Sequence, residues 1–117
     1  LNVPYKDHVY TERPKWFEGD KQTLGLVFPN LPYLIDGDFN LTESSALLRY
    51  VPKRFGNPEL LGKNIQDQAR VDQFIGVSHD IYMAVIPELR QEGWETRRTE
   101  IYAKGKDKLE EFEKNVG

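Results

Sequence analysis

Leu24-Gly-Leu-Val-Phe-Pro-Asn-Leu-Pro-Tyr-Leu-Ile-Asp-Gly37 is the stretch that decides the fold of this chain. Pro29 and Pro32 cannot donate a backbone hydrogen bond to a sheet and fit badly inside a helix, so the stretch begins as a constrained loop. Its last residues favour a strand at 33–35 and, with the Asp36-Gly37 pair, the turn of a hairpin. The sequence therefore predicts a loop that leads into a strand, a tight turn and a second strand at 39–41.

A helix is predicted directly after this hairpin. Thr42 is followed by Glu43 and two serines, a typical helix start with Thr42 as the N-cap, and apolar residues recur with helical spacing over 46–55. This order of elements resembles the second half of a thioredoxin-like domain: a loop, a proline, a strand, a hairpin turn, a second strand and a capped helix.

Two stretches of the sequence closely resemble the mu-class glutathione transferases. They are residues 24–37 and the following Leu41-Thr-Glu-Ser-Ser-Ala-Leu-Leu-Arg-Tyr50. The resemblance extends in weaker form over nearly the whole chain, and it covers only the central part of that family's fold. It implies an α/β protein in three parts. Residues 1–55 would form a partial thioredoxin-like, glutathione-binding domain that lacks its first strand and helix, 56–63 a linker, and 64–117 part of the all-α C-terminal domain.

Outside the central stretch the expected structure is mostly helical. Residues 5–10 alternate weakly and predict a short strand, residues 14–23 a short helix or turn, and 56–63 a turn-rich linker. From Asn64 a long helix is expected, which Pro87 breaks or kinks. One face of it would carry Ala69, Phe74, Ile81 and Val85, with Ile65 nearby.

A last helix is expected from about 95 to 115, after a turn at Glu92-Gly93. Its apolar or small residues recur at steps of three and four, and Gly105 would allow close approach to a neighbouring helix. The positions are Ile101, Gly105, Leu109, Phe112 and Val116.

Composition excludes several classes of function. The 117 residues carry a net charge of -3, so nothing favours binding to nucleic acid. Cysteine is absent, which excludes disulfides and thiol nucleophiles, and two histidines, His8 and His79, cannot alone build a metal site. There is neither a signal-peptide pattern nor an apolar run near the roughly 20 residues that a membrane span needs. We expect a cytoplasmic protein.

The start of the second helix is the first candidate site. From the residues alone it can be a simple cap, or it can bind a ligand, because a helix N-terminus offers free N–H groups and the positive end of a dipole to a carboxylate. Ser44 would add a donor, and Glu43 could accept from an ammonium. The resemblance implies that this pair holds the glutamyl end of glutathione.

Two further sets come from the same resemblance. Pro32 would be cis, with the Leu31 backbone pairing with the cysteinyl part of glutathione and Asn30 beside the thiol; the alternative is an ordinary trans loop proline. Arg13, Trp16 and Lys21 would hold the glycine carboxylate. The alternative is a half-buried surface tryptophan and a solvated lysine.

The resemblance also implies a dimer. Asp80 would reach the glutathione of the other subunit, Phe28 would insert between helices of the partner, and Arg49 would stack at the two-fold axis. The alternatives are a solvated carboxylate for Asp80 and, for Phe28, packing on its own loop, although an exposed aromatic at a loop tip favours a partner surface.

The implied function is conjugation of glutathione, as co-substrate, to hydrophobic electrophiles in detoxification. The family's catalytic tyrosine ends a strand that would precede residue 1, so no catalytic residue is assigned within the chain. A pocket tyrosine of the family would fall at Arg90. Two alternatives remain, a non-catalytic structural subunit of a larger assembly and an unrelated thioredoxin-like binding module.

Overall fold

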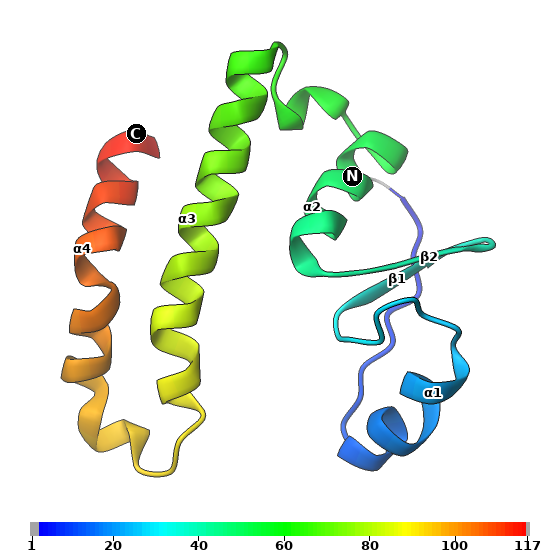
Figure 1. The fold of residues 1–117 in the computed structure, drawn as a ribbon, viewed down its shortest axis with the longest axis horizontal. Helices are drawn as coiled ribbons and strands as arrows, with labels where there is room; N and C mark the ends of the chain where they lie inside the picture. The colour runs from blue at the N-terminus through cyan, green and yellow to red at the C-terminus, as the bar shows by residue number, and fades with distance from the viewer. Residues whose placement is uncertain (1–2, 117) are drawn as a thin grey trace. The chain divides into compact units, whose positions relative to one another are not determined.

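A computed structural model describes residues 3–116, and the chain forms two compact units, residues 1–61 and 62–117 (Figure 1). The boundary, between Leu61 and Gly62, lies inside the predicted linker 56–63. A small antiparallel hairpin in the first unit is followed by a helix, and the second unit is helical throughout. This confirms the expected α/β class, a partial thioredoxin-like domain followed by part of an all-α domain.

The first unit is built around the predicted hairpin. Strand β1 (Tyr33–Asp36) pairs antiparallel with β2 (Phe39–Thr42), so that Tyr33 lies opposite Thr42. Gly37 in the turn has a φ of 61°, a conformation that favours glycine. Helix α2 (Ser44–Phe55) follows. Before the hairpin come a π-helical segment (Lys15–Asp20) and α1 (Lys21–Thr23), and a 3-10 turn (Pro58–Leu61) ends the unit.

Two local predictions in this unit are wrong. Residues 5–10 form no strand, since Tyr5 and Val9 are 87% and 69% exposed and the alternating face has nothing to pack on. Thr42 is not the N-cap of α2. It is the last residue of β2, is buried, and its hydroxyl donates to the Phe28 carbonyl at 2.8 Å, so a tertiary hydrogen bond replaces the expected cap.

Polar contacts attach α2 to the hairpin. The Asp36 carboxylate accepts from the Tyr50 hydroxyl at 2.7 Å and from Arg54 Nε at 2.8 Å, and the rings of Phe39 and Tyr50 lie 5.0 Å apart. The hydrogen bond to Asp36 and then burial raise the pKa of Tyr50. These contacts fix the direction in which α2 leaves the sheet, and therefore where its N-terminal end lies.

The second unit is a pair of long helices that lie side by side (Figure 1). Helix α3 (Ile65–Leu89) begins at Asn64, whose side chain accepts from the Asp67 N–H at 2.9 Å. Pro87 lies within its last turn, and the helix ends two residues later. Gly93, with a φ of 75°, precedes a 3-10 turn (Trp94–Arg97) and helix α4 (Arg98–Val116).

The predicted helix faces meet over most of this pair. Ile101 is 2% exposed, the rings of Phe74 and Phe112 contact edge to face at 5.4 Å, and Gly105 lies against Val85. Ala69 and Ile65 are exposed, so the expected face of α3 does not extend into its first turns. The side chain of Val116 lies outside the described residues. None of the helices described over residues 3–116 combines the length and apolar character that crossing a membrane requires.

Candidate functional site

The N-terminal end of α2 is open. Glu43, directly before the helix, has a φ of 70° and a ψ of 114°, and its carbonyl accepts from the N–H groups of Ala46 and Leu47, both at 3.0 Å. A side chain other than glycine held in this region costs about 1–3 kcal/mol. No side-chain hydrogen bond caps the helix, and Ser44 is exposed as its first residue. The positive end of the helix dipole and the Ser44 hydroxyl are therefore available to an anion.

The loop before β1 contains the expected cis bond. The peptide bond between Leu31 and Pro32 is cis, as the resemblance implied. Leu31 lines a groove of about 1160 Å³ that runs between the extended N-terminal segment and β1. The Leu31 N–H already donates to Asn30 Oδ1 at 2.9 Å, so a ligand that uses this donor must displace the Asn30 side chain.

Trp16 is more buried than a surface tryptophan. Its side chain lies in the π-helical segment with 3% of the residue exposed, stacked on Tyr33 at 5.9 Å and tilted against Tyr10 at 5.3 Å. No buried side-chain nitrogen or oxygen among the described residues lacks a hydrogen-bond partner, and none of these residues accepts from the indole N–H. That N–H therefore retains some solvent accessibility.

Two cations lie over the ring of Phe17, the residue that follows this tryptophan. The Arg13 guanidinium lies 4.9 Å and the Lys21 ammonium 5.4 Å from the ring centroid of the adjacent Phe17. Cation–π contacts at this range hold both positive charges near one ring. The structure thus places Arg13, Trp16 and Lys21 in one short helical segment, with both positive charges at the ring of Phe17.

The structure contains a group of hydrogen-bonded side chains beside Trp16 that was not predicted from the sequence. Tyr10 donates its hydroxyl proton to Asp20 Oδ2 at 2.6 Å, its oxygen lies 3.0 Å from that of Tyr33, and the Tyr33 oxygen lies 3.2 Å from His8 Nδ1. The partners are 10 to 25 residues apart in the chain, so no local pattern indicates them. Within residues 3–116 no hydrogen bond or ion pair joins the sets Arg13/Trp16/Lys21, Asn30/Leu31 and Glu43/Ser44 to one another.

Three curated relatives identify the family. The class-mu 26 kDa glutathione S-transferase of Schistosoma mansoni is 36% identical over 115 residues, which are 97% of this chain and 51% of that protein. The class-mu 26 kDa glutathione S-transferase isozyme 51 of Fasciola hepatica is 39% identical over 88 residues. These residues are 74% of this chain and 38% of that protein. The chain belongs to the mu-class-like glutathione S-transferases. Glutathione S-transferase Mu 1 of Oryctolagus cuniculus is 42% identical over 78 residues, which are 61% of this chain and 34% of that protein.

The chain spans about half the length, or less, of these relatives, and no family model matches it. The residues expected at a dimer interface lie as follows. Phe28 is 72% exposed, so its ring does not pack on its own loop. Arg49 donates to the Ser45 carbonyl at 2.7 Å, one turn earlier in α2.

Asp80 already has a cation within its own unit. Its carboxylate accepts from Lys108 Nζ at 2.9 Å, a bond between α3 and α4 that lowers the pKa of Asp80. A glutathione ammonium from another subunit would have to compete with Lys108 for this carboxylate.

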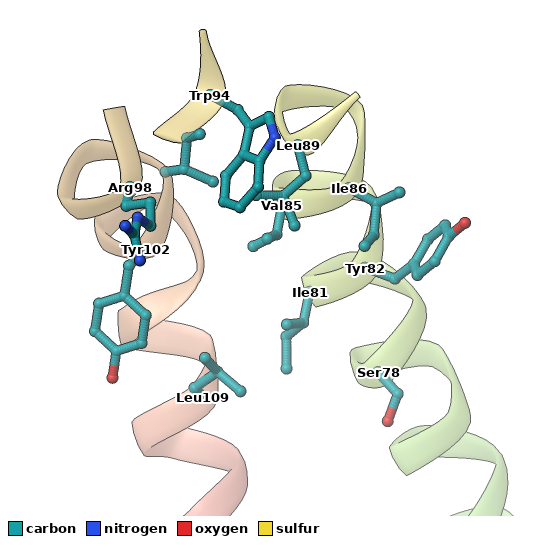
Figure 2. A pocket seen from close by; sticks show the side chains of 11 residues that line it. Ser78, Ile81, Tyr82, Val85, Ile86, Leu89, Trp94, Arg98, Tyr102 and Leu109 are labelled. Carbon is teal, nitrogen blue, oxygen red and sulfur yellow. The ribbon is translucent and has the colours of Figure 1, made fainter. Parts of the chain in front are cut away.

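The helical unit carries an apolar groove of about 560 Å³. Figure 2 shows Ile81 and Val85 of α3 pointing toward α4, Trp94 across the end of the pair, and Tyr82 turned away from α4. The remaining lining residues are Ser78, Ile86, Leu89, Arg98, Ile101, Tyr102 and Leu109. None of the residues predicted for glutathione binding lines this groove.

Proposed function

We propose that the protein binds glutathione through residues 1–61 and transfers it to a hydrophobic electrophile. The observation that carries the proposal is the uncapped N-terminal end of α2 behind the strained Glu43, in a chain similar over 97% of its length to a class-mu glutathione S-transferase. Strained residues that persist in a fold cluster at binding and catalytic sites.

The two charged groups on the α-carbon of a γ-glutamyl group match the start of α2. Its carboxylate would accept from the backbone N–H groups and the Ser44 hydroxyl at the positive end of the helix. Its ammonium would donate to the Glu43 carboxylate. One side chain and one helix end thus recognise opposite charges that lie on a single carbon of the ligand.

The rest of the tripeptide matches the other two sets. The cysteinyl amide would pair with the Leu31 backbone, replacing the local bond from Asn30. The glycine carboxylate would lie at the indole N–H of Trp16, between the charges of Arg13 and Lys21. In the transfer itself the thiol loses its proton, the sulfur forms a bond to an electrophilic carbon, and a leaving group departs with its electron pair. The residues of this chain bind and orient the donor.

Calorimetry with the intact protein tests the site. Ser44→Ala removes a hydrogen bond to a charged group and should weaken glutathione binding by about 1.5–3 kcal/mol. Ser45→Ala is the matched control, because it changes the neighbouring exposed serine of the same turn and should leave the affinity unchanged. Equal affinities for Ser44→Ala and the wild type would show that this helix end binds no ligand. Binding without turnover of an aromatic electrophile would favour the non-catalytic alternative.

We also propose a homodimer in which Phe28 is covered by the partner. Phe28 lies between Val27 and Pro29 on an exposed loop, and burying a phenylalanine side chain contributes about 1.5–3 kcal/mol. Phe28→Ser should therefore weaken association by about tenfold or more, measured by analytical ultracentrifugation. Tyr5→Ser, at another exposed aromatic, is the control. A Phe28→Ser variant that associates as tightly as wild type would exclude this role.

A further inference from the structure

We infer that Tyr10 is a positioning residue for the carboxylate-binding indole of Trp16. The inference rests on the proposed glutathione site and adds to it a residue to which neither the sequence nor the relatives assign a role. Tyr10 does not touch the ligand in this scheme. It acts by fixing the ring whose N–H would meet the glycine carboxylate.

The first support is how the indole is held. Tyr33 stacks on it with an interplanar angle of 11°, and Tyr10 packs against it at 60°. The ring is almost completely buried, while its N–H retains some solvent accessibility. The direction of that N–H therefore depends on where the two tyrosine rings lie.

The second support is the direction of the hydrogen bonds that fix the tyrosines. The ionised Asp20 carboxylate can only accept, so Tyr10 donates to it at 2.6 Å. Tyr10 has one proton and has given it away, hence its oxygen accepts from the Tyr33 hydroxyl at 3.0 Å. The Tyr33 oxygen must in turn accept from His8, whose Nδ1 carries the proton.

The three hydrogen bonds therefore run in one direction, with His8, Tyr33 and Tyr10 as successive donors and Asp20 as the final acceptor. Such chains strengthen each bond by polarisation, and they have one arrangement of protons rather than two. Burial of the hydroxyl, and then its bond to Asp20, raise the pKa of Tyr10 above its usual range, so it remains a donor at neutral pH. Tyr10 is the member that bonds both to the charged end and to the second tyrosine.

This series of hydrogen bonds also explains how an irregular segment of the protein is held in place. Residues 3–11 have no helix or strand, yet His8 and Tyr10 stack at 4.6 Å and both join the hydrogen-bond chain. The network connects this segment to the end of the π-helical segment and to β1. Trp16 lies against its two central members.

The experiment compares two ligands on the intact protein. Tyr10→Phe keeps the ring and removes the hydroxyl, and it should weaken glutathione binding roughly threefold to tenfold, the scale of one net hydrogen bond. The same variant should bind γ-glutamylcysteine, which lacks the glycine, as the wild type does. A purely structural loss would weaken both ligands equally and would overturn the inference.

A double-mutant cycle with Trp16→Phe tests whether Tyr10 acts through the indole. In the Trp16→Phe background, Tyr10→Phe should have no further effect on glutathione affinity. Additive losses would overturn the inference. Tyr5→Phe is the matched control, since Tyr5 lies on the same segment, is 87% exposed and should tolerate the change without effect.

Asp20→Asn provides a second test if Tyr10→Phe folds poorly. It keeps the shape and an acceptor oxygen and removes the charge, so it should weaken binding of glutathione alone, by less than Tyr10→Phe. Unchanged glutathione affinity in both variants overturns the role of Tyr10 and leaves the proposed function intact. A wild-type protein that binds no glutathione overturns the proposed function, and the inference with it.

Discussion

Replacing Gly105 by alanine tests how closely α3 and α4 approach. A Cβ atom at Gly105 would lie 3.0 Å from Val85 Cγ2 and 3.9 Å from Ile81 Cγ2. The second distance is an ordinary van der Waals contact, whereas the first is shorter than the roughly 3.5–4.0 Å at which two carbon atoms attract. Figure 2 shows both side chains pointing toward α4. The new methyl group therefore enters the helix interface itself.

Two opposing effects set the magnitude. Alanine in place of glycine stabilises a helix interior by about 0.5–1 kcal/mol, because glycine loses more conformational freedom on folding. Overpacking a close interface costs about 1–3 kcal/mol. Val85 is β-branched and has one strongly preferred χ1 in a helix, so it cannot easily rotate away. We expect Gly105→Ala to lower the free energy of unfolding by up to about 2 kcal/mol.

Gly76→Ala is the matched control for this change. Gly76 is an exposed residue of α3, and nothing lies within 4 Å of a Cβ atom built on it, so only the helix gain of about 0.5–1 kcal/mol applies. Urea unfolding followed by circular dichroism measures both variants. The difference between them should be about 1–3 kcal/mol. If Gly105→Ala stabilises the protein as much as Gly76→Ala does, the close contact of the two helices is refuted.

Two further changes test other contacts. Thr42→Val keeps the shape of a buried residue and removes the donor to the Phe28 carbonyl, so it should cost about 1–3 kcal/mol in urea unfolding, and unchanged stability would mean the bond is dispensable. Hydrogen bonds from Lys104 and then Arg97 lower the pKa of Glu88 below its ordinary value of 4.5. These bonds therefore stabilise the fold fully above about pH 4.5, and the stabilisation is lost as the pH falls through the lowered pKa. Glu88→Gln should therefore lower Tm at about pH 7 and have little effect at about pH 2; an equal effect at both would contradict this.

The hairpin and the long helices could be predicted because their signals are local. Asp36-Gly37 indicates the turn from two adjacent residues, and the steps of three and four along α4 place Ile101 and Gly105 on the buried face. The strand expected at 5–10 failed for the opposite reason. Its alternation was weak, and its segment is fixed instead by hydrogen bonds from His8 and Tyr10 to residues that lie far along the chain.

The error at the start of α2 is the most informative one. The local sequence predicts Thr42 as the helix cap. In the structure its hydroxyl instead donates to the carbonyl of Phe28, 14 residues earlier in the chain. This leaves the helix without a side-chain cap and places the strained Glu43 directly before Ser44. Local rules fail in real proteins mainly where function competes with stability. A helix end that gives up its cap and tolerates strain retains free donors, which is the property that an anion-binding site requires.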